Sequence, residues 1–316
     1  MTRSGPSTDE RAVDPFVHEA LLYEGHRDYL DYTLRFIYEG LSADEPVMVA
    51  APPANVALLR ERLGALADDV RFHDMTVAGR NPARIIPWVL DDFMNEHRGR
   101  RVRIVGEPIW VGRTAAEYPV AVQHEAMINA AFTGRAATIL CPYDASRLDQ
   151  QAIVDSELTH PIMVTAGQRV PSYEYDPYGV TAQYNRPLPE PPPGATTLRF
   201  EVTDLVKVRG VVGGQAHRVG LTPERTAELQ LAVNEVATNS VEHGGGSGTL
   251  RTWREHDRVV CEIRDFGYVT DTMIGRLQPP TPDARGYGLV LVHYLCDLVQ
   301  VHTTLTGTAT RMHMLA

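Results

Sequence analysis

LQLAVNEVATNSVEHGGG, residues 229–246, places an acid and an amide on one face of an apolar-periodic segment. Glu235 and Asn239 are four residues apart, so on a helix their side chains project from the same side, one turn from each other. Beside them runs an apolar stripe, which comprises Leu229, Leu231, Val233, Val236 and Val241. The segment therefore predicts a helix that packs on a core and carries two polar groups at the border of that core.

The flanking sequence predicts an α+β two-layer sandwich around this helix. Thr222 is the expected N-cap of the helix and Gly244 its expected end. Strands are predicted at 196–204, 300–306 and 308–316, a hairpin at 248–267 with His256 and Asp257 near its turn, and further helices at 208–221 and 286–299. Antiparallel strands with helices on one side give the sandwich.

Length, charge and hydropathy exclude several classes of protein. The 316 residues are enough for two ordinary domains, at roughly 100–200 residues per domain. A formal net charge of −10 argues against a general nucleic-acid-binding surface. No apolar run approaches the roughly 20 residues that span a bilayer. The polar start MTRSGPSTDERAVDP lacks the apolar core of a signal peptide. We expect a cytoplasmic protein with no membrane segment and no direct nucleic-acid contact.

The cysteines and the lysine exclude two kinds of site. Cys141, Cys261 and Cys296 are odd in number, lie far apart and fall inside apolar segments. They are typical of buried thiols in a reducing compartment, not of a disulfide framework or a zinc site. Lys207 is the single lysine and stands in DLVKVRG, so the phosphate loop Gly-x-x-x-x-Gly-Lys-Ser/Thr is absent.

Residues 16–164 alternate between strand-like and helix-like segments. Strands are predicted at 16–23, 45–52, 70–75, 100–110, 136–144 and 161–165, and helices at 25–41, 53–66, 82–97, 116–134 and 146–160. Continuous apolar strands that alternate with helices predict a mostly parallel sheet with helices on both faces. Residues 168–195 then lack periodicity and are rich in proline and tyrosine, which is typical of a linker.

Four motifs follow in a fixed order in the last 120 residues. They are LAVNEVATNSVEH (231–243), IRDFG (263–267), ARGYGLVLVHYLCDLVQV (284–301) and GTATRMHM (307–314). This order resembles the ATP-binding (GHKL) fold shared by gyrase, the ninety-kilodalton heat-shock chaperones, histidine kinases and the repair protein MutL. In detail it looks most like the anti-sigma-factor serine kinases. Residues 196–316 are therefore expected to form an ATP-binding domain of that type.

The resemblance implies roles for Glu235 and Asn239, and elementary chemistry agrees with them. Mg²⁺ takes hard oxygen ligands together with phosphate oxygens, which suits the side-chain carbonyl of Asn239 as its metal ligand. Glu235 is one turn away and suits a general base acting on a water or a serine hydroxyl near the terminal phosphate. The expected cofactors are ATP and Mg²⁺, and Glu235 is the expected catalytic residue.

The remaining motifs supply the expected nucleotide contacts. Asp265 suits a hydrogen bond from the adenine amino group, and Gly267 lets the base approach the backbone. Glycines at a helix start offer amide groups to phosphates, and Arg285 is the candidate to neutralise the γ-phosphate. The full set of expected contacts is Asn239, His243, Asp265, Gly267, Arg285, Gly286, Tyr287, Gly288, Leu289 and Thr308.

Each motif also has a plainer interpretation. A Glu and Asn pair on a helix is usually a solvated edge, Asp-x-Gly is often a turn, and Gly244 to Gly246 fit a helix end. Val269 stands where the second motif of the family often has another glycine, a departure that favours nucleotide binding over nucleotide turnover. No helical hairpin with a phosphoacceptor histidine precedes the domain, and His160 is followed directly by a proline. Histidine autophosphorylation is therefore disfavoured.

The first domain resembles a sensor. EPVMVAAP, VRIVGEPIW, HEAMINAAF, ILCPYD and LTHP look like motifs of the MEDS sensory domain, a RecA-like α/β module of bacterial regulators; they fall within residues 14–167. Such modules are thought to sense small organic compounds. Ligands of open parallel sheets bind outside the carboxyl ends of the strands. This rule would bring together residues near Ala51, Glu107, Trp110, Cys141 and Tyr143, with His18 or His26 near the first strand. Trp110 and Tyr143 are equally well explained as core or rim aromatics.

These features predict a bacterial regulator in which a small-molecule sensor controls an anti-sigma-type ATP-binding domain. Its expected partners are a sigma factor, an anti-anti-sigma (STAS) protein or both, and a homodimer is expected because anti-sigma kinases are commonly dimers. The expected activity is phosphorylation of a serine or threonine on the partner. One alternative is a non-catalytic module whose shape is set by nucleotide, and the other is an orphan sensor histidine kinase.

Overall fold

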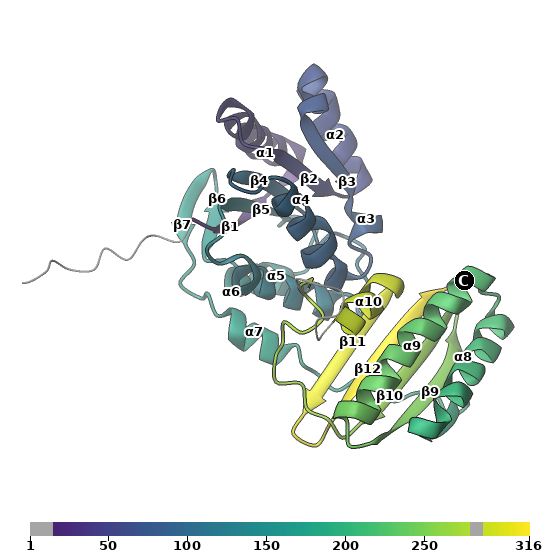
Figure 1. The fold of residues 1–316 in the computed structure, drawn as a ribbon. Helices are drawn as coiled ribbons and strands as arrows, with labels where there is room; N and C mark the ends of the chain where they lie inside the picture. Colours follow the sequence, from purple (N-terminus) through teal and green to yellow (C-terminus); the bar gives the residue numbers. More distant parts are fainter. Residues whose placement is uncertain (1–14, 279–286) are drawn as a thin grey trace, which may run out of the picture.

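The computed structural model describes residues 15–278 and 287–316, and these form two sheets with their helices (Figure 1). The first sheet has the order β3-β2-β4-β5-β1-β6-β7. Its strands are β1 (Val17–Tyr23), β2 (Val47–Ala51), β3 (Val70–Asp74), β4 (Val102–Gly106), β5 (Ala137–Asp144), β6 (Ile162–Thr165) and β7 (Gln168–Pro171). All neighbours pair in parallel except β7, which runs antiparallel to β6.

Helices cover both faces of this sheet. They are α1 (Gly25–Ser42), α2 (Pro53–Leu63), α3 (Met75–Ala78), α4 (Asp91–Glu96), α5 (Tyr118–Phe132) and α6 (Gln150–Thr159). Alternate residues of each strand enter two separate cores: Leu140 packs with α1 and α2, and Ile139 with α4, α5 and α6. Both faces are therefore apolar, which explains the continuous apolar runs in the sequence. The expected α/β class is confirmed.

The second sheet is antiparallel, with the order β11-β12-β10-β9-β8. Its strands are β8 (Thr196–Glu201), β9 (Ser247–Glu255), β10 (Arg258–Asp265), β11 (Leu298–Thr304) and β12 (Gly307–Leu315). Three helices lie on one face of it: α8 (Leu205–Val219), α9 (Pro223–His243) and α10 (Tyr287–Leu295) (Figure 1). The expected two-layer sandwich is confirmed. His256 adopts a φ of 55° at the β9–β10 turn, where the hairpin was expected.

The predicted helix over 82–97 is interrupted. Pro82–Arg84 form a 3-10 turn, Ile86–Leu90 form a wide π turn, and α4 begins only at Asp91. Pro87 explains the difference, because proline has no N–H to donate and its ring clashes with the carbonyl four residues earlier. The apolar periodicity continues through this proline, so the pattern alone overestimates the length of the helix.

Two short elements lie within residues 168–195, where the sequence predicts only a linker. β7 extends the first sheet, and α7 (Pro177–Gln183) packs against α5 and buries Val180. Asp176 starts α7, since its carboxylate accepts the Gly179 N–H at 2.9 Å. Elements of four and seven residues are too short to show a period, which is why the sequence pattern does not reveal them.

The later part of that segment lies along the face of the second sheet that carries no helix. Glu262 on β10 is fully buried there and pairs with Arg311 of β12 at 2.5 Å. Arg311 also donates to the Pro189 carbonyl, and Glu190 pairs with Arg264 at 3.1 Å. The proline-rich stretch is thus fixed to the sheet by ion pairs and hydrogen bonds.

Helix α10 contacts the first domain along one side (Figure 1). The Asn81 side chain is fully buried and donates to the His293 carbonyl at 2.9 Å. The rings of Trp88 and Tyr294 lie 4.8 Å apart between centroids. Arg80 pairs with Asp297 at 3.0 Å, just after the helix. The interrupted segment 80–92 of the first domain therefore packs on a helix of the second.

No helix within the described ranges is long and apolar enough to cross a membrane.

Candidate functional site

Helix α9 places Glu235 and Asn239 at the border of the second core. Thr222 is its N-cap, as expected, because its hydroxyl accepts the Arg225 N–H at 3.2 Å. The buried face of the helix carries Leu229, Ala232, Val233, Val236, Ala237 and Ser240. Leu231 is 43% exposed, so its assignment to the apolar stripe is wrong; two residues from both Leu229 and Val233, it points about 200° away on a helix.

Glu235 and Asn239 are half-buried on α9. Within the described residues, neither side chain makes a hydrogen bond or an ion pair. A Cβ added at Gly288 would lie 2.5 Å from Glu235 Oε2, so the first turn of α10 abuts the carboxylate. A solvated helix edge does not have a second helix against its acid. The pair therefore lies at the junction between α9 and the first turn of α10.

Asp265, at the end of β10, is joined to α9 through Ser240. The Ser240 hydroxyl donates to Asp265 Oδ2 at 2.6 Å, and the Gly267 N–H donates to Oδ1 at 2.8 Å. Each carboxylate oxygen keeps a further lone pair for a ligand. Ser240 is not among the contacts expected from the sequence, although its place next to Asn239 and one turn from Val236 puts it on the buried face.

Thr308 lies opposite Asp265 in the β10–β12 register. Its hydroxyl donates to the Gly267 carbonyl at 2.8 Å and lies 2.8 Å from the hydroxyl of Thr303. The Thr303 hydroxyl in turn accepts the Val269 N–H at 3.0 Å. These threonines fix the chain that leaves Asp265, and they satisfy the backbone at the position where the family often has a second glycine.

The other expected nucleotide contacts have fewer described interactions with the site. Tyr287, Gly288 and Leu289 form the first turn of α10 and are half-buried. His243 is exposed at the end of α9, with Glu242 at 3.8 Å as its charged neighbour. Arg285 and Gly286 lie outside the described residues.

The residues expected to bind a ligand in the first domain separate into two groups. Glu107 faces α1 and α2, where it accepts from Tyr29 at 2.6 Å and from Asn55 at 2.8 Å. Cys141 and Tyr143 face the opposite side of the sheet and contact Glu125. A single pocket that contains all of them is therefore wrong, because alternate residues of a strand point to opposite faces.

The remaining members of that set have different surroundings. Ala51 ends β2 and is fully buried, whereas His26 is exposed on the first turn of α1. Trp110 stacks under the guanidinium of Arg113, 3.8 Å from its ring centroid. His18 lies on the same face as Cys141, at 3.4 Å from its sulfur.

Sequence comparisons match both halves of the chain. Residues 17–161 match the family of the MEthanogen/methylotroph, DcmR Sensory (MEDS) domain, and residues 198–314 match the family of the histidine kinase-like ATPase domain. The two expected family assignments are confirmed, and the finer label RecA-like for the first domain stays a prediction. A search of curated proteins found no match.

Solved structures show distant similarity. One contains the RsbU and RsbW domains of Rv1364c from Mycobacterium tuberculosis, with 16% identity, a TM-score of 0.29, and 38% of this chain and 32% of that chain covered. Another is the histidine kinase AdeS of Acinetobacter baumannii, with 12% identity, a TM-score of 0.25, and 38% and 67% covered. The chain thus spans about a third of the length of the first of these structures.

A substitution at Gly244 tests how closely the end of α9 packs against Asp265. A Cβ at this position would lie 2.6 Å from Asp265 Cγ and 2.6 Å from the Ser240 carbonyl, although the φ of −100° suits any residue. Gly244→Ala is expected to lower the free energy of unfolding by about 1–3 kcal/mol through overpacking. Gly214→Ala on α8, with 3.7 Å to its nearest neighbour, is the matched control and is expected to stabilise by up to about 1 kcal/mol. Equal denaturant midpoints for the two variants would contradict the tight contact.

Glu107 makes stability depend on pH. Burial raises the pKa of its carboxyl to about 7, against hydrogen bonds from Tyr29 and Asn55 that lower it. The folded state then holds a proton that the unfolded state has lost, so stability falls as the pH rises between the ordinary value and about 7. This group is expected to contribute a loss of up to about 3 kcal/mol by about pH 8, which Glu107→Gln abolishes. Thermal melts across that pH range check it, with the exposed Glu24→Gln as control; a Glu107→Gln curve parallel to the wild type would contradict it.

Proposed function

We propose that this chain, which joins a MEDS sensory domain to a histidine kinase-like ATPase domain, is a signalling regulator of the anti-sigma type. Its second domain binds ATP with Mg²⁺, binds a sigma factor, an anti-anti-sigma (STAS) protein or both, and phosphorylates a serine or threonine of the partner. The observation that carries the proposal is the half-buried pair Glu235 and Asn239 beside the start of α10, whose side chains have no partner among residues 15–278 and 287–316.

The described residues fit a nucleotide with its metal. Asp265 has lone pairs left on both oxygens to accept from an adenine amino group, and Ser240 and Gly267 hold its orientation. The free carbonyl of Asn239 is a hard oxygen ligand of the kind that Mg²⁺ takes alongside phosphate. Gly288 leaves the space next to Glu235 that a side chain would fill. Bound Mg²⁺ would neutralise charge on the phosphates.

Glu235 would act as the general base. Its carboxylate accepts the proton of the attacking serine or threonine hydroxyl as that oxygen bonds to the terminal phosphorus and the bond to the ADP oxygen breaks. Glycine amides at the start of α10 and the expected contact Arg285 would stabilise the charge on the phosphates. The half-burial of Glu235 keeps the base close to the ligand while leaving access for a partner's hydroxyl.

A second candidate is a binding module that uses nucleotide only to set its shape. Val269 supports it, because the usual second glycine is replaced and the 269 N–H is taken up by Thr303. A histidine kinase is supported less, since His160 is fully buried and is not exposed to a nucleotide on another domain. The two surviving candidates differ only in phosphate transfer.

Helix α10 is the proposed route by which the sensor acts on the nucleotide. Its first turn abuts Glu235, and its other end carries His293 and Tyr294, which contact Asn81 and Trp88 of the first domain. A movement of the segment 80–92 would shift the residues that face the phosphates. Coupling of this kind requires an element that contacts both sites, and α10 is such an element.

The proposed sensor ligand is a small organic molecule. A cavity of about 320 Å³ lies beside α5 and is lined by Phe16, Met127 and Ala130, together with Thr272 and Met273 from the loop after β10. The apolar side chains share the walls with polar ones such as His18, Asn129 and Thr133, a mixture that suits a small organic ligand. Residues from both domains line the cavity, so an occupant would contact both.

We further propose that the protein is cytoplasmic and acts as a homodimer.

Substitutions on α9 and β10 separate binding from transfer. Asp265→Asn is expected to weaken ATP binding about tenfold or more, because it replaces the acceptor for the adenine amino group. Glu235→Gln is expected to keep binding and to reduce transfer to a STAS partner by about 10²–10⁴-fold. Isothermal titration and radiolabelled ATP measure the two effects, with Glu242→Gln, an exposed acid on the same helix, as the matched control.

The outcomes distinguish the candidates. ATP binding without transfer by the wild type, to any STAS partner that it binds, would support the shape-setting module. Acid-labile phosphate on the chain itself would support the histidine kinase. Unchanged ATP affinity in Asp265→Asn would contradict the proposed site.

The proposed route through α10 predicts a signal from Trp88. With Trp110→Phe and Trp253→Phe, Trp88 is the only tryptophan of the chain. Its fluorescence is expected to change with nucleotide and to saturate at the binding stoichiometry, because α10 carries its ring neighbour Tyr294. The control variant keeps only Trp253, on β9, and is expected to stay constant. A constant Trp88 signal at full nucleotide occupancy would argue against this route.

A further inference from the structure

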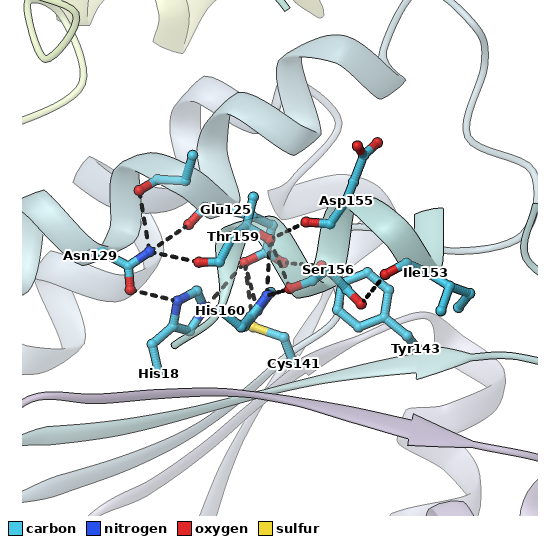
Figure 2. A network of polar contacts seen from close by, with 11 residues as sticks. His18, Glu125, Asn129, Cys141, Tyr143, Ile153, Asp155, Ser156, Thr159 and His160 are labelled. Carbon is cyan, nitrogen blue, oxygen red and sulfur yellow. Dashed lines mark hydrogen bonds and ion pairs between the residues drawn. The ribbon is translucent and has the colours of Figure 1, made fainter. Parts of the chain in front are cut away.

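Four buried side chains of the MEDS domain direct metal-binding atoms at one point (Figure 2). They are His18 on β1, Glu125 on α5, Cys141 on β5 and His160 just after α6, and their side chains lie in the buried interior. Their ligand atoms all lie within 4.8 Å of one another. Nothing in the proposed nucleotide chemistry uses this cluster.

Four of the six distances between ligand atoms in the cluster match a coordination shell. Glu125 Oε2 lies 3.3 Å from His18 Nε2, 3.5 Å from His160 Nε2 and 3.5 Å from the Cys141 sulfur. His18 Nε2 lies 3.4 Å from the same sulfur. A tetrahedral Zn²⁺ with bonds of about 2.0–2.3 Å separates its ligand atoms by about 3.3–3.8 Å. These four distances fall within that range.

Hydrogen bonds around the cluster orient both imidazole rings. His160 Nδ1 lies 2.9 Å from the Ser156 carbonyl, which can only accept, so Nδ1 carries the proton. His18 Nδ1 lies 3.0 Å from the side-chain oxygen Oδ1 of Asn129. The Nδ2 group of the same side chain donates to the Thr159 carbonyl at 2.8 Å, which holds the amide in place. The Nε2 lone pairs of both rings therefore point into the cluster. Such outer hydrogen bonds are the usual support of metal-bound histidines.

The cluster is poorly satisfied without a cation. Within the described residues, His160 Nε2 has no hydrogen-bond partner, although its side chain is fully buried. When both rings are neutral, their Nε2 lone pairs face the negatively charged carboxylate of Glu125, and the lone pairs and the carboxylate repel each other. Tyr143 donates to the other carboxylate oxygen, Oε1, at 3.3 Å, which leaves Oε2 directed at the two rings. A thiolate and a carboxylate would together balance a divalent charge, so the filled site would be neutral in its buried surroundings.

We propose that His18, Glu125, Cys141 and His160 bind one divalent cation of the zinc class within the MEDS domain. Two imidazoles, one thiolate and one carboxylate in a tetrahedral arrangement favour Zn²⁺ over Mg²⁺ or Ca²⁺. Four protein ligands close the coordination shell, as in structural zinc sites. The ion joins β1, β5, α5 and the end of α6, and His18 also lines the cavity of about 320 Å³. In this proposal Cys141 is a metal ligand, whereas the sequence led us to expect only a buried thiol.

The test uses the full chain without a histidine tag, stripped with a chelator and titrated with Co²⁺. One Co²⁺ per chain is expected to bind and to give d–d bands of tetrahedral intensity with a thiolate-to-cobalt charge-transfer band, both lost on adding Zn²⁺. Cys141→Ser is expected to lose the charge-transfer band. Cys261→Ser and Cys296→Ser change equally buried thiols of the other domain and are the matched controls. Asn129→Ala is expected to weaken metal binding about 10–100-fold.

A measurement on the wild type alone guards against a variant that fails to fold. X-ray absorption of the zinc-loaded chain is expected to show one sulfur and three nitrogen or oxygen ligands. A folded chain that binds no Co²⁺, a zinc shell without sulfur, or a charge-transfer band that persists in Cys141→Ser and disappears in Cys261→Ser would each overturn the site. None of these readouts depends on nucleotide, so the metal site and the proposed kinase activity can fail separately.

Discussion

The hydrogen bond from the Ser240 hydroxyl to Asp265, 2.6 Å long, joins the helix layer of the second domain to its sheet. It fixes α9 against the end of β10, and Gly244 leaves room for this contact because a side chain there would strike Asp265. The positions of Glu235 and Asn239 follow from it, since both lie on the same rigid helix. Once α9 is fixed, the start of α10 can approach Glu235 only through a glycine, and Gly288 supplies it.

The two domains share α10 as a common element. The helix buries Val292 in the core of its own domain and presents the His293 carbonyl and the Tyr294 ring to the other. Asp297 extends the contact, because one of its oxygens pairs with Arg80 of the first domain and the other with Arg225 at the start of α9. A polar, partly stacked interface suits a contact that changes during signalling better than a large apolar one would.

The MEDS domain buries polar groups on both faces of its sheet. Glu107, Tyr29 and Asn55 form a hydrogen-bonded set under α1 and α2. His18, Glu125, Cys141 and His160 form the other set under α5 and α6. Buried polar groups are costly unless they are paired, so each set needs a compensating partner. Hydrogen bonds supply it for Glu107, and the proposed cation supplies it on the other face.

The sequence by itself determined the helix between the caps Thr222 and Gly244, the placement of Glu235 and Asn239 on one face of it, and the alternation of strands and helices. These features depend on caps and on periods of two and 3.6 residues, which act over short distances. Only the tertiary structure brought Cys141 to His18, 123 residues away, and separated Glu107 from both. That outcome depends on strand order and on which face each residue occupies, and neither is encoded in local spacing. For the same reason the sequence showed no sign of Ser240 as the link to Asp265 or of α10 as the contact between domains.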